Sequence, residues 1–232
     1  MITLPIRPAL VVFDVNETLS DMAPIAGRFA DVGADGHLAE LWFAIVLRDG
    51  FALTAAGASP SFATLAEGGL RSMLAGVVSD RTLDAAVAHV MEGFAALKVH
   101  PDVPPGIESL ASAGHRMVTL SNGSAAVAER LLAGCGLRGR FEACLSVDDA
   151  GAWKPARAAY LHAAAVCGVE PAQTLMVAVH PWDIDGATRA GLRTAWLSRA
   201  GRPYPEHFIA PDLRVGTVGE LVERLADTPD AG

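Results

Sequence analysis

Short apolar runs, each followed by a polar residue, recur along this sequence and alternate with alanine- and leucine-rich stretches that have helical spacing. A continuous apolar run is typical of a strand buried on both faces, as in a parallel sheet. Strands that alternate with helices predict right-handed βαβ units with helices on both faces of the sheet. The sequence therefore predicts an α/β fold with a parallel sheet core. The predicted strands are residues 9–13, 116–120, 174–179 and 193–197, with a weaker candidate at 143–147, and the predicted helices are residues 106–113, 125–135, 157–167 and 185–190.

Residues 20–98 interrupt this alternation, because they contain helical patterns and no strand-like run. The helices predicted in this segment are residues 39–47, 62–74 and 83–96. An all-helical insert directly after the first strand suggests a cap over the strand ends. We therefore expect a Rossmann-like core made of residues 1–19 and 99–232, and a helical cap domain made of residues 20–98.

Composition and charge narrow the class of protein. Hydrophobic residues make up 51% of the 232 residues and charged residues 19%, which is typical of a globular chain with a large core. No apolar run approaches the roughly 20 residues that span a bilayer, and no signal peptide is visible, so we expect no membrane partner. The net charge of −8 argues against nucleic-acid binding and requires any anion site to be locally positive. The three cysteines match no metal-ligand spacing, and as buried reduced thiols they favour a cytoplasmic location.

Polar residues stand at or just after the ends of several predicted strands. They are Asp14, Ser121, His180 and Asp183. In parallel sheets ligands bind beyond the carboxyl ends of the strands, so this convergence predicts a site. Asp14 could be an ordinary turn residue, but Thr18 is spaced to hydrogen-bond its carboxylate. Ser121 and Asn122 at a predicted helix start form either an anion site or an ordinary helix cap.

Four segments, in this order, resemble the motifs of the haloacid dehalogenase (HAD) superfamily. They are residues 13–19 with Asp14, residues 121–124, Trp153-Lys154-Pro155 with Tyr160 six residues after the lysine, and residues 180–183 followed by Asp185-Gly186-Ala187. The resemblance implies the HAD fold, with Asp14 as a covalent nucleophile.

One departure indicates a branch of this superfamily. Its phosphatases carry a second aspartate two residues after the nucleophile, as general acid for the leaving alkoxide. This chain has Asn16 there, and an amide cannot donate and recover a proton. A halide leaves as a stable anion and needs no proton. The L-2-haloacid dehalogenase branch lacks that aspartate, and the chain resembles it further in residues 121–123, in the spacing of Lys154 and Tyr160, in Trp182-Asp183 and in the cap between residues 42 and 62.

The resemblance implies a two-step hydrolysis of short 2-haloalkanoic acids to 2-hydroxy acids. Asp14 displaces the halide and forms an ester on the enzyme, and water then attacks the carboxyl carbon of Asp14. Thr18 and Lys154 would support Asp14, Ser121 and backbone amides would hold the substrate carboxylate, and Asp183 would position or activate the water. No metal or other cofactor is implied. A homodimer is also expected from the resemblance.

Departures from the branch affect the predicted pocket. The branch usually has an arginine after the tryptophan of the first cap helix, to receive the halide, but here Phe43 follows Trp42. Arg48 lies five residues on, about 140° around a helix. It can take this role only if the helix ends first, and Asp49-Gly50 is typical of a helix stop.

The pocket also differs at two positions near the strand ends. Asn16 replaces an expected tyrosine and makes the pocket more polar, and His180 and Ala178 stand where asparagine and serine are usual. A lone histidine is more often structural, but at a strand end beside Asp183 we predict that His180 activates the water or donates to the departing halide. The predicted substrate-binding residues are Asn16, Ser121, Asn122, Trp42, Phe43, Arg48, Tyr160 and Trp182.

Two other functions stay open. A magnesium-dependent phosphatase acting on a small phosphate ester is the main alternative, and it would need an acid other than Asn16. The site could also serve a different substrate, or belong to a binding protein on the same fold. In each case we expect a small anionic ligand.

Overall fold

The computed structural model describes residues 4, 6–78, 81–199 and 201–229, and the chain divides into two compact units. The core unit consists of Met1–Ser20 and Val99–Gly232, and the helical insert consists of Asp21–Lys98. Ser20 and Val99 form an isolated antiparallel bridge where the chain leaves and re-enters the core unit. The two ends of the core unit at the insertion point are therefore adjacent.

Within the described residues, the core unit contains a six-stranded parallel sheet in the order β3-β2-β1-β4-β5-β6. The strands are β1 (Leu10–Phe13), β2 (Met117–Ser121), β3 (Ala143–Ser146), β4 (Thr174–Ala178), β5 (Arg193–Leu197) and β6 (Leu213–Val215). β1 lies between β2 and β4, with Val12 opposite Val118 on one side and Met176 on the other. The order of the strands reverses beside β1, which is where parallel α/β sheets bind ligands.

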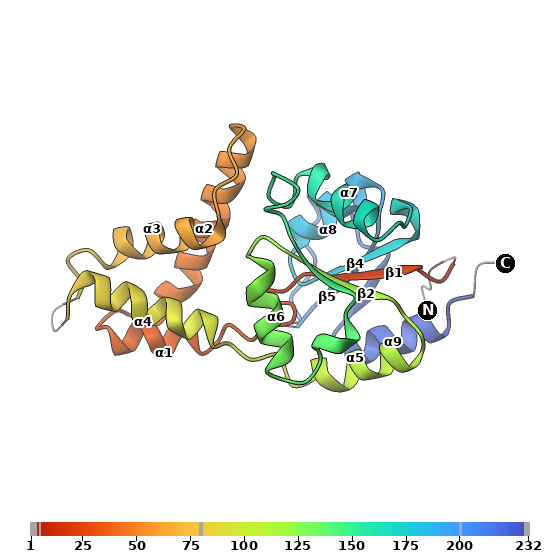
Figure 1. Cartoon of the computed structure of the whole chain (residues 1–232), viewed down its shortest axis with the longest axis horizontal. Coiled ribbons are helices and arrows are strands. Elements are labelled where there is room, and N and C mark those ends of the chain that lie inside the picture. The colour runs from red at the N-terminus through yellow and green to blue at the C-terminus, as the bar shows by residue number, and fades with distance from the viewer. Residues whose placement is uncertain (1–3, 5, 79–80, 200, 230–232) are drawn as a thin grey trace. The chain divides into compact units, whose positions relative to one another are not determined.

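Helices cover both faces of this sheet, as Figure 1 shows. On one face lie α5 (Val103–Ser112), α6 (Ala125–Ala133) and α9 (Val218–Ala226), and on the other lie α7 (Arg157–Val166) and α8 (Pro181–Ala190). The short 3₁₀ turns η1 (Arg138–Arg140) and η2 (Pro171–Gln173) connect some of these elements. Val11 and Phe13 pack into the apolar cluster that contains Ile107 of α5 and Leu221 of α9. Because side chains alternate along a strand, Val12 points to the opposite face.

The predicted α/β fold is confirmed, and all five predicted runs form strands. In the core unit the sequence patterns missed β6 and α9, and α8 begins at Pro181 rather than at residue 185. β6 escapes a pattern search because it is three residues long with the exposed Arg214 at its centre. Of the cysteines, all of them free, Cys144 is buried as expected, whereas Cys135 and Cys167 are partly exposed.

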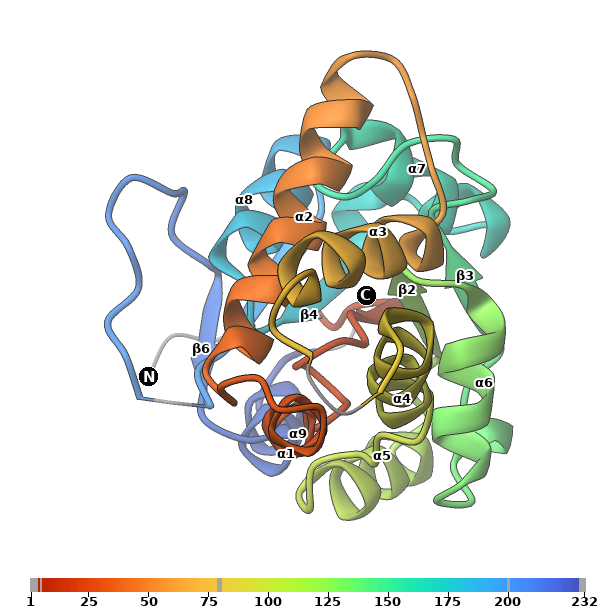
Figure 2. The same cartoon turned by 90° about the vertical axis from the view of Figure 1, so that its left-hand side faces the viewer.

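The helical insert has its own core. In its described part it contains α1 (Ile25–Asp31), α2 (Leu38–Ala55), α3 (Phe62–Leu74) and α4 (Leu83–Ala95), which Figure 2 shows. Trp42 packs against Phe29 and Phe94, and its indole N–H donates to the carbonyl of Ala66 at 2.9 Å. Phe62 stacks on Phe94 with ring centroids 5.1 Å apart. No helix among the described residues is long and apolar enough to cross a membrane.

The predicted helix stop at Asp49-Gly50 is wrong. α2 continues through both residues to Ala55, and the chain turns at Gly57, whose φ is +84°. Gly50 is buried on the same stripe as Trp42 and Val46, so the packed face of the helix extends past it. Packing of this stripe outweighs the low helix propensity of glycine, which costs about 1 kcal/mol.

Candidate active site

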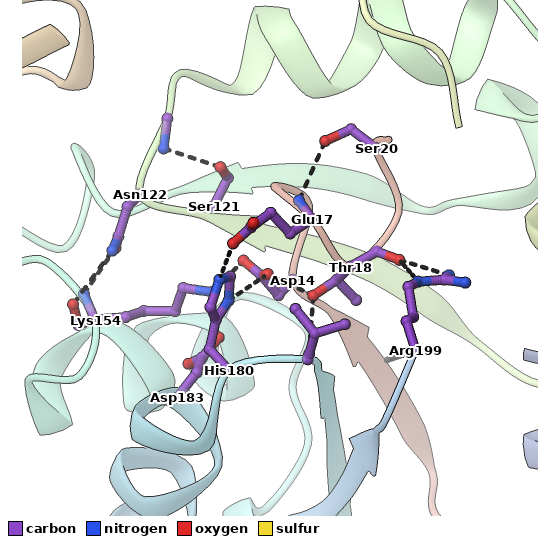
Figure 3. Close-up of polar contacts among 12 residues, drawn as sticks. Asp14, Glu17, Thr18, Ser20, Ser121, Asn122, Lys154, His180, Asp183 and Arg199 are labelled. Carbon is purple, nitrogen blue, oxygen red and sulfur yellow. Dashed lines mark hydrogen bonds and ion pairs between the residues drawn. The ribbon is translucent and has the colours of Figure 1, made fainter. Parts of the chain in front are cut away.

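Asp14 directly follows β1 and extends its pairing with β4, since its backbone N–H donates to the carbonyl of Val177 at 3.0 Å. The residue is 4% exposed. It lies between the ends of β2 and β4, where Ser121 and His180 are also found (Figure 3). The sheet topology thus brings Asp14 close to polar residues that are more than a hundred positions away from it in the sequence.

Both carboxylate oxygens of Asp14 accept hydrogen bonds. The Thr18 hydroxyl donates to Oδ2 at 2.6 Å, and the Lys154 ammonium donates to Oδ1 at 2.8 Å. Thr18 Oγ1 is itself fixed, because it accepts the backbone N–H of Val179 at 3.1 Å. Burial alone would raise the pKa of Asp14, but the positive charges of Lys154 and His180 outweigh it and hold the pKa well below its usual range. Asp14 is therefore an ionised carboxylate in fixed orientation, as a nucleophile requires.

Lys154 also binds Asp183. Its ammonium donates to Asp183 Oδ2 at 2.7 Å, and the Tyr160 hydroxyl donates to the other oxygen at 2.6 Å. Lys154 and Asp183 are fully buried. Burial lowers the pKa of Lys154, but the two carboxylates raise it more, so the ammonium stays charged. Burial and the nearby charge of Asp14 raise the pKa of Asp183, which makes it a stronger base than an ordinary aspartate.

Asn122 holds the loop that carries Lys154. Its amide oxygen accepts the backbone N–H of Lys154 at 2.9 Å, and its amide nitrogen donates to the carbonyl of Lys154 at 3.3 Å. The side chain predicted to bind substrate thus binds the protein's own backbone. Ser121 Oγ accepts the N–H of Gly123 at 2.9 Å, which leaves the hydroxyl proton of Ser121 able to donate. The loop from Ser121 leads to the N-terminus of α6 at Ala125.

His180 lies between two carboxylates. Its Nε2 is 2.7 Å from Oε2 of Glu17, and its Nδ1 is 3.4 Å from Oδ2 of Asp14. Its ring stacks on that of Trp182, with centroids 4.9 Å apart. Burial lowers the pKa of His180, but the two carboxylates raise it to about 9. An imidazolium has no lone pair with which to deprotonate water, so of the two predicted roles this environment favours donation.

Two neighbours of the site were not predicted. Glu17 contacts His180 from 163 positions away, and nothing in the local sequence indicates this pairing. Arg199 donates from Nε and Nη2 to the carbonyl of Thr18 at 3.1 and 2.7 Å, and from Nη1 to Asp102 at 2.7 Å. Arg199 follows the end of β5, so its strand-end position was the signal that could have identified it.

The remaining predicted residues have no described polar contact with this cluster, and three of them belong to the helical insert. Asn16 is 8% exposed, two residues after Asp14. Trp42 and Phe43 are buried within the core of the helical insert. Arg48 is exposed on α2 and paired with Asp49 at 2.8 Å. Phe43 occupies the position of the halide-binding arginine of the branch. Because α2 does not end at Asp49, the condition under which Arg48 could take the role of that arginine is not met.

The donor set around the two aspartates does not suit a metal ion. Each oxygen of Asp14 and Asp183 already accepts a hydrogen bond from the protein. Lys154 and protonated His180 would repel a divalent cation. Such a cation prefers oxygen ligands that are not already paired with positively charged side chains. In the part of the chain that the structure describes, no group of three or more histidine, cysteine, aspartate and glutamate residues could hold a metal.

Comparison with known proteins agrees with the motifs and the fold. A model of the haloacid dehalogenase-like hydrolase family matches residues 8–191. An (S)-2-haloacid dehalogenase of Burkholderia cepacia is 32% identical over 219 residues, covering 93% of this chain and 94% of that protein, and haloacetate dehalogenase H-2 of Moraxella sp. is 31% identical over 143 residues, covering 62% and 64%. The crystal structure of an L-2-haloacid dehalogenase, 30% identical, matches with a TM-score of 0.88 and covers 96% of this chain and all of that one. The chain therefore belongs to the haloacid dehalogenase-like hydrolases, and within them to the L-2-haloacid dehalogenase branch.

Proposed function

We propose that this protein hydrolyses short 2-haloalkanoic acids to 2-hydroxy acids through an ester formed on Asp14. The observation that carries the proposal is the ionised Asp14 carboxylate, held by Thr18 and Lys154 at the end of β1. Two residues later stands Asn16, which cannot protonate an alkoxide leaving group. Displacement of a halide needs a nucleophile but no such acid.

In the first step, one oxygen of Asp14 attacks the carbon that bears the halogen, from the side opposite the halide. A carbon–oxygen bond forms, the carbon–halogen bond breaks, and the halide leaves with the bonding electrons. Thr18 and Lys154 keep the carboxylate oriented for this attack. Ser121 and the backbone N–H groups leading to α6 bind the substrate carboxylate, because a helix N-terminus attracts anions.

In the second step, water attacks the carboxyl carbon of the Asp14 ester. Asp183 accepts a proton from this water, and its raised pKa suits that role. The bond between that carbon and the ester oxygen breaks, and the alkoxide takes up the proton held by Asp183 and leaves as the 2-hydroxy acid. The other proton of the water is lost to solvent, which regenerates the Asp14 carboxylate. Lys154 and His180 supply the positive charge that the site needs, so the cycle as proposed uses no metal.

The magnesium-dependent phosphatase is the weaker alternative. It requires a general acid near Asp14, and Asn16 occupies the position of that acid. It also requires room for a cation among carboxylates that already bind Lys154. The cytoplasmic location and the homodimer stay predictions.

Halide release tests the proposal directly. Chloro-, bromo- and fluoroacetate and both enantiomers of 2-chloropropionate are supplied with and without a chelator, and halide is measured with ion-selective electrodes. We expect release from at least one chloro or bromo acid, unaffected by chelator. Asp14→Asn should abolish it, whereas Asp227→Asn, which alters an exposed carboxylate at the end of α9, should not. Cleavage of p-nitrophenyl phosphate without attack on any haloacid, or loss of activity with chelator, would contradict the proposal.

An isotope experiment tests the ester. Excess enzyme is given one turnover of substrate in heavy-oxygen water, and the peptide containing Asp14 is weighed by mass spectrometry. Because water attacks the carboxyl carbon, the label should enter Asp14 and not the product. Label in the product after one turnover would show direct attack by water and overturn the mechanism.

A further inference from the structure

Glu17 has a backbone conformation that its side chain does not favour. Its φ is +61°, and among the described residues it is the one non-glycine residue with a positive φ. Only glycine adopts this left-handed region without steric cost, because it lacks a β-carbon. The backbone of the turn is held by two bonds, since the Glu17 N–H donates to Ser20 Oγ at 3.3 Å and its carbonyl lies 3.0 Å from His100 Nε2. Neither bond uses the side chain, so the turn itself gives no reason for glutamate.

The side chain of Glu17 makes its contact at the active site. Its carboxylate is 2.7 Å from Nε2 of His180, while Nδ1, the other ring nitrogen, lies 3.4 Å from Oδ2 of Asp14, at ion-pair distance (Figure 3). The His180 side chain is 12% exposed, and Trp182 stacks on its ring. The hydrogen bond between Nε2 and Glu17 and the indole on the ring face hold the imidazole with Nδ1 at ion-pair distance from Asp14.

We propose that Glu17 is a positioning residue for the dehalogenation reaction: its carboxylate holds the imidazolium of His180 with Nδ1 beside the reacting carboxyl group of Asp14. The inference rests on the proposed function, because it assigns a role in that reaction. Glu17 itself touches neither the substrate nor the reacting atoms.

The charges around His180 explain why a second carboxylate is needed. Asp14 faces the ring from the end of β1 and Glu17 faces it from the following turn, and both favour the cation. Lys154 lies on the far oxygen of Asp14 and opposes it. Once Asp14 becomes an ester, its negative charge is lost, and Glu17 is then the carboxylate that keeps His180 charged. Negative charge develops on the Asp14 carboxyl group when water adds to the ester, and a donor already in place stabilises it.

The test compares the pH dependence of haloacid turnover in wild type and Glu17→Gln, which keeps an acceptor oxygen but removes the charge. We expect the high-pH fall of kcat/KM to move down by about one pH unit or more. On the acidic plateau, where His180 is protonated in both proteins, the rates should agree within about threefold. The change at neutral pH should affect kcat more than KM, because Glu17 does not bind substrate. Glu223→Gln, an exposed glutamate of α9, is the matched control and should leave the profile unchanged.

Two further variants separate positioning from folding. Glu17→Gly removes the unfavourable β-carbon together with the carboxylate, so the relief of backbone strain offsets part of the lost ion pair, and the variant should fold and still show the shifted profile. In a His180→Asn background, Glu17→Gln should have no further effect on the profile, because the residue that it positions is gone. A shift of the same size in that background would overturn the proposal.

A second measurement does not depend on turnover. The ring nitrogens of His180 are titrated by NMR in histidine-labelled protein, with His180→Asn to assign the signals. If no haloacid is hydrolysed but the His180 midpoint falls in Glu17→Gln, the proposed function fails and the positioning contact stands. If haloacid is hydrolysed and either the midpoint or the kinetic profile is unchanged in Glu17→Gln, the inference is wrong.

Discussion

One buried ammonium group joins the two carboxylates on which the proposed chemistry depends. Lys154 is fully buried, and an isolated charge at such a depth would be strongly destabilising. It remains charged because Asp14 and Asp183 each accept one of its hydrogen bonds. The three side chains therefore depend on one another, both for stability and for orientation.

Replacing Lys154 by methionine should expose this dependence. The variant leaves two buried carboxylates facing each other, so we expect a loss of about 3 kcal/mol in unfolding free energy and no measurable halide release. Urea denaturation and a halide electrode measure the two effects. Lys98→Met, the same change at an exposed lysine, is the control. A Lys154→Met protein of wild-type stability would show that the aspartates do not need the ammonium.

His180 should make stability depend on pH. Its folded-state pKa of about 9 lies above the ordinary value of 6.5, so its protonation favours the folded state. That contribution is complete below pH 6.5 and is lost as the pH rises through 9. The difference in unfolding free energy between wild type and His180→Asn should therefore shrink from about pH 6 to about pH 10. A difference that is constant with pH would mean that folding does not change the pKa of His180.

At the scale of elements, α8 is positioned by its close approach to the segment that carries Lys154. A β-carbon built on Gly186 of α8 would lie 2.6 Å from Pro155 Cβ and 2.7 Å from the hydroxyl of Tyr160. Both distances are shorter than side chains tolerate, so a glycine is required here. The same contact sets the distance between Asp183 and its two donors.

Gly186→Ala should therefore destabilise the protein by about 2 kcal/mol, although alanine is the better helix former. Gly68→Ala in α3 is the matched control, because its β-carbon would meet nothing within 4 Å. We expect that control to be neutral or more stable by up to about 1 kcal/mol. Thermal melting of the pair measures the contrast. Equal effects of the two substitutions would mean that the packing at Gly186 is not tight.

The continuation of α2 gives a second prediction at this scale. Arg48 is exposed and paired with Asp49 on a helix that does not end there. We expect Arg48→Ala to leave kcat/KM for haloacids within about twofold, since solvent-exposed ion pairs contribute little. A fall of a hundredfold or more would restore Arg48 as a halide-binding residue.

At the scale of the whole molecule, the described contacts of Asp14, Lys154, Asp183 and His180 lie within the core unit. The insert joins this unit at Ser20 and Val99, which pair with each other. The 78 residues between Ser20 and Val99 could therefore be removed without separating the two chain ends of the core unit.

Replacing residues 21–98 by a short glycine-serine linker should leave a folded core. Because a linker of a few residues spans paired ends at little entropic cost, we expect one cooperative urea transition, followed by tryptophan fluorescence. Trp153, Trp182 and Trp196 remain in this variant to report on the core. A broad transition, or none, would show that the core needs the insert to fold.

The sequence by itself determined the α/β architecture and the order of the motifs. Apolar runs of strand length identify buried parallel strands wherever they occur, and the topology of such a sheet places the residues that follow β1, β2 and β4 at one edge. Asp14, Ser121 and His180 could be assigned to that edge for this reason, without coordinates. That position 16 carries asparagine and not a carboxylic acid is likewise read directly from the sequence.

Only the tertiary structure decided the partners and the charge states within the site. Glu17 pairs with His180, and Asn122 holds the backbone of Lys154, because folding brings together segments that no local pattern relates. Charge states follow burial and the distance to neighbouring charges, which a sequence does not give. The continuation of α2 past Gly50 has the same cause, since packing against the rest of the insert outweighed a local helix-stop signal.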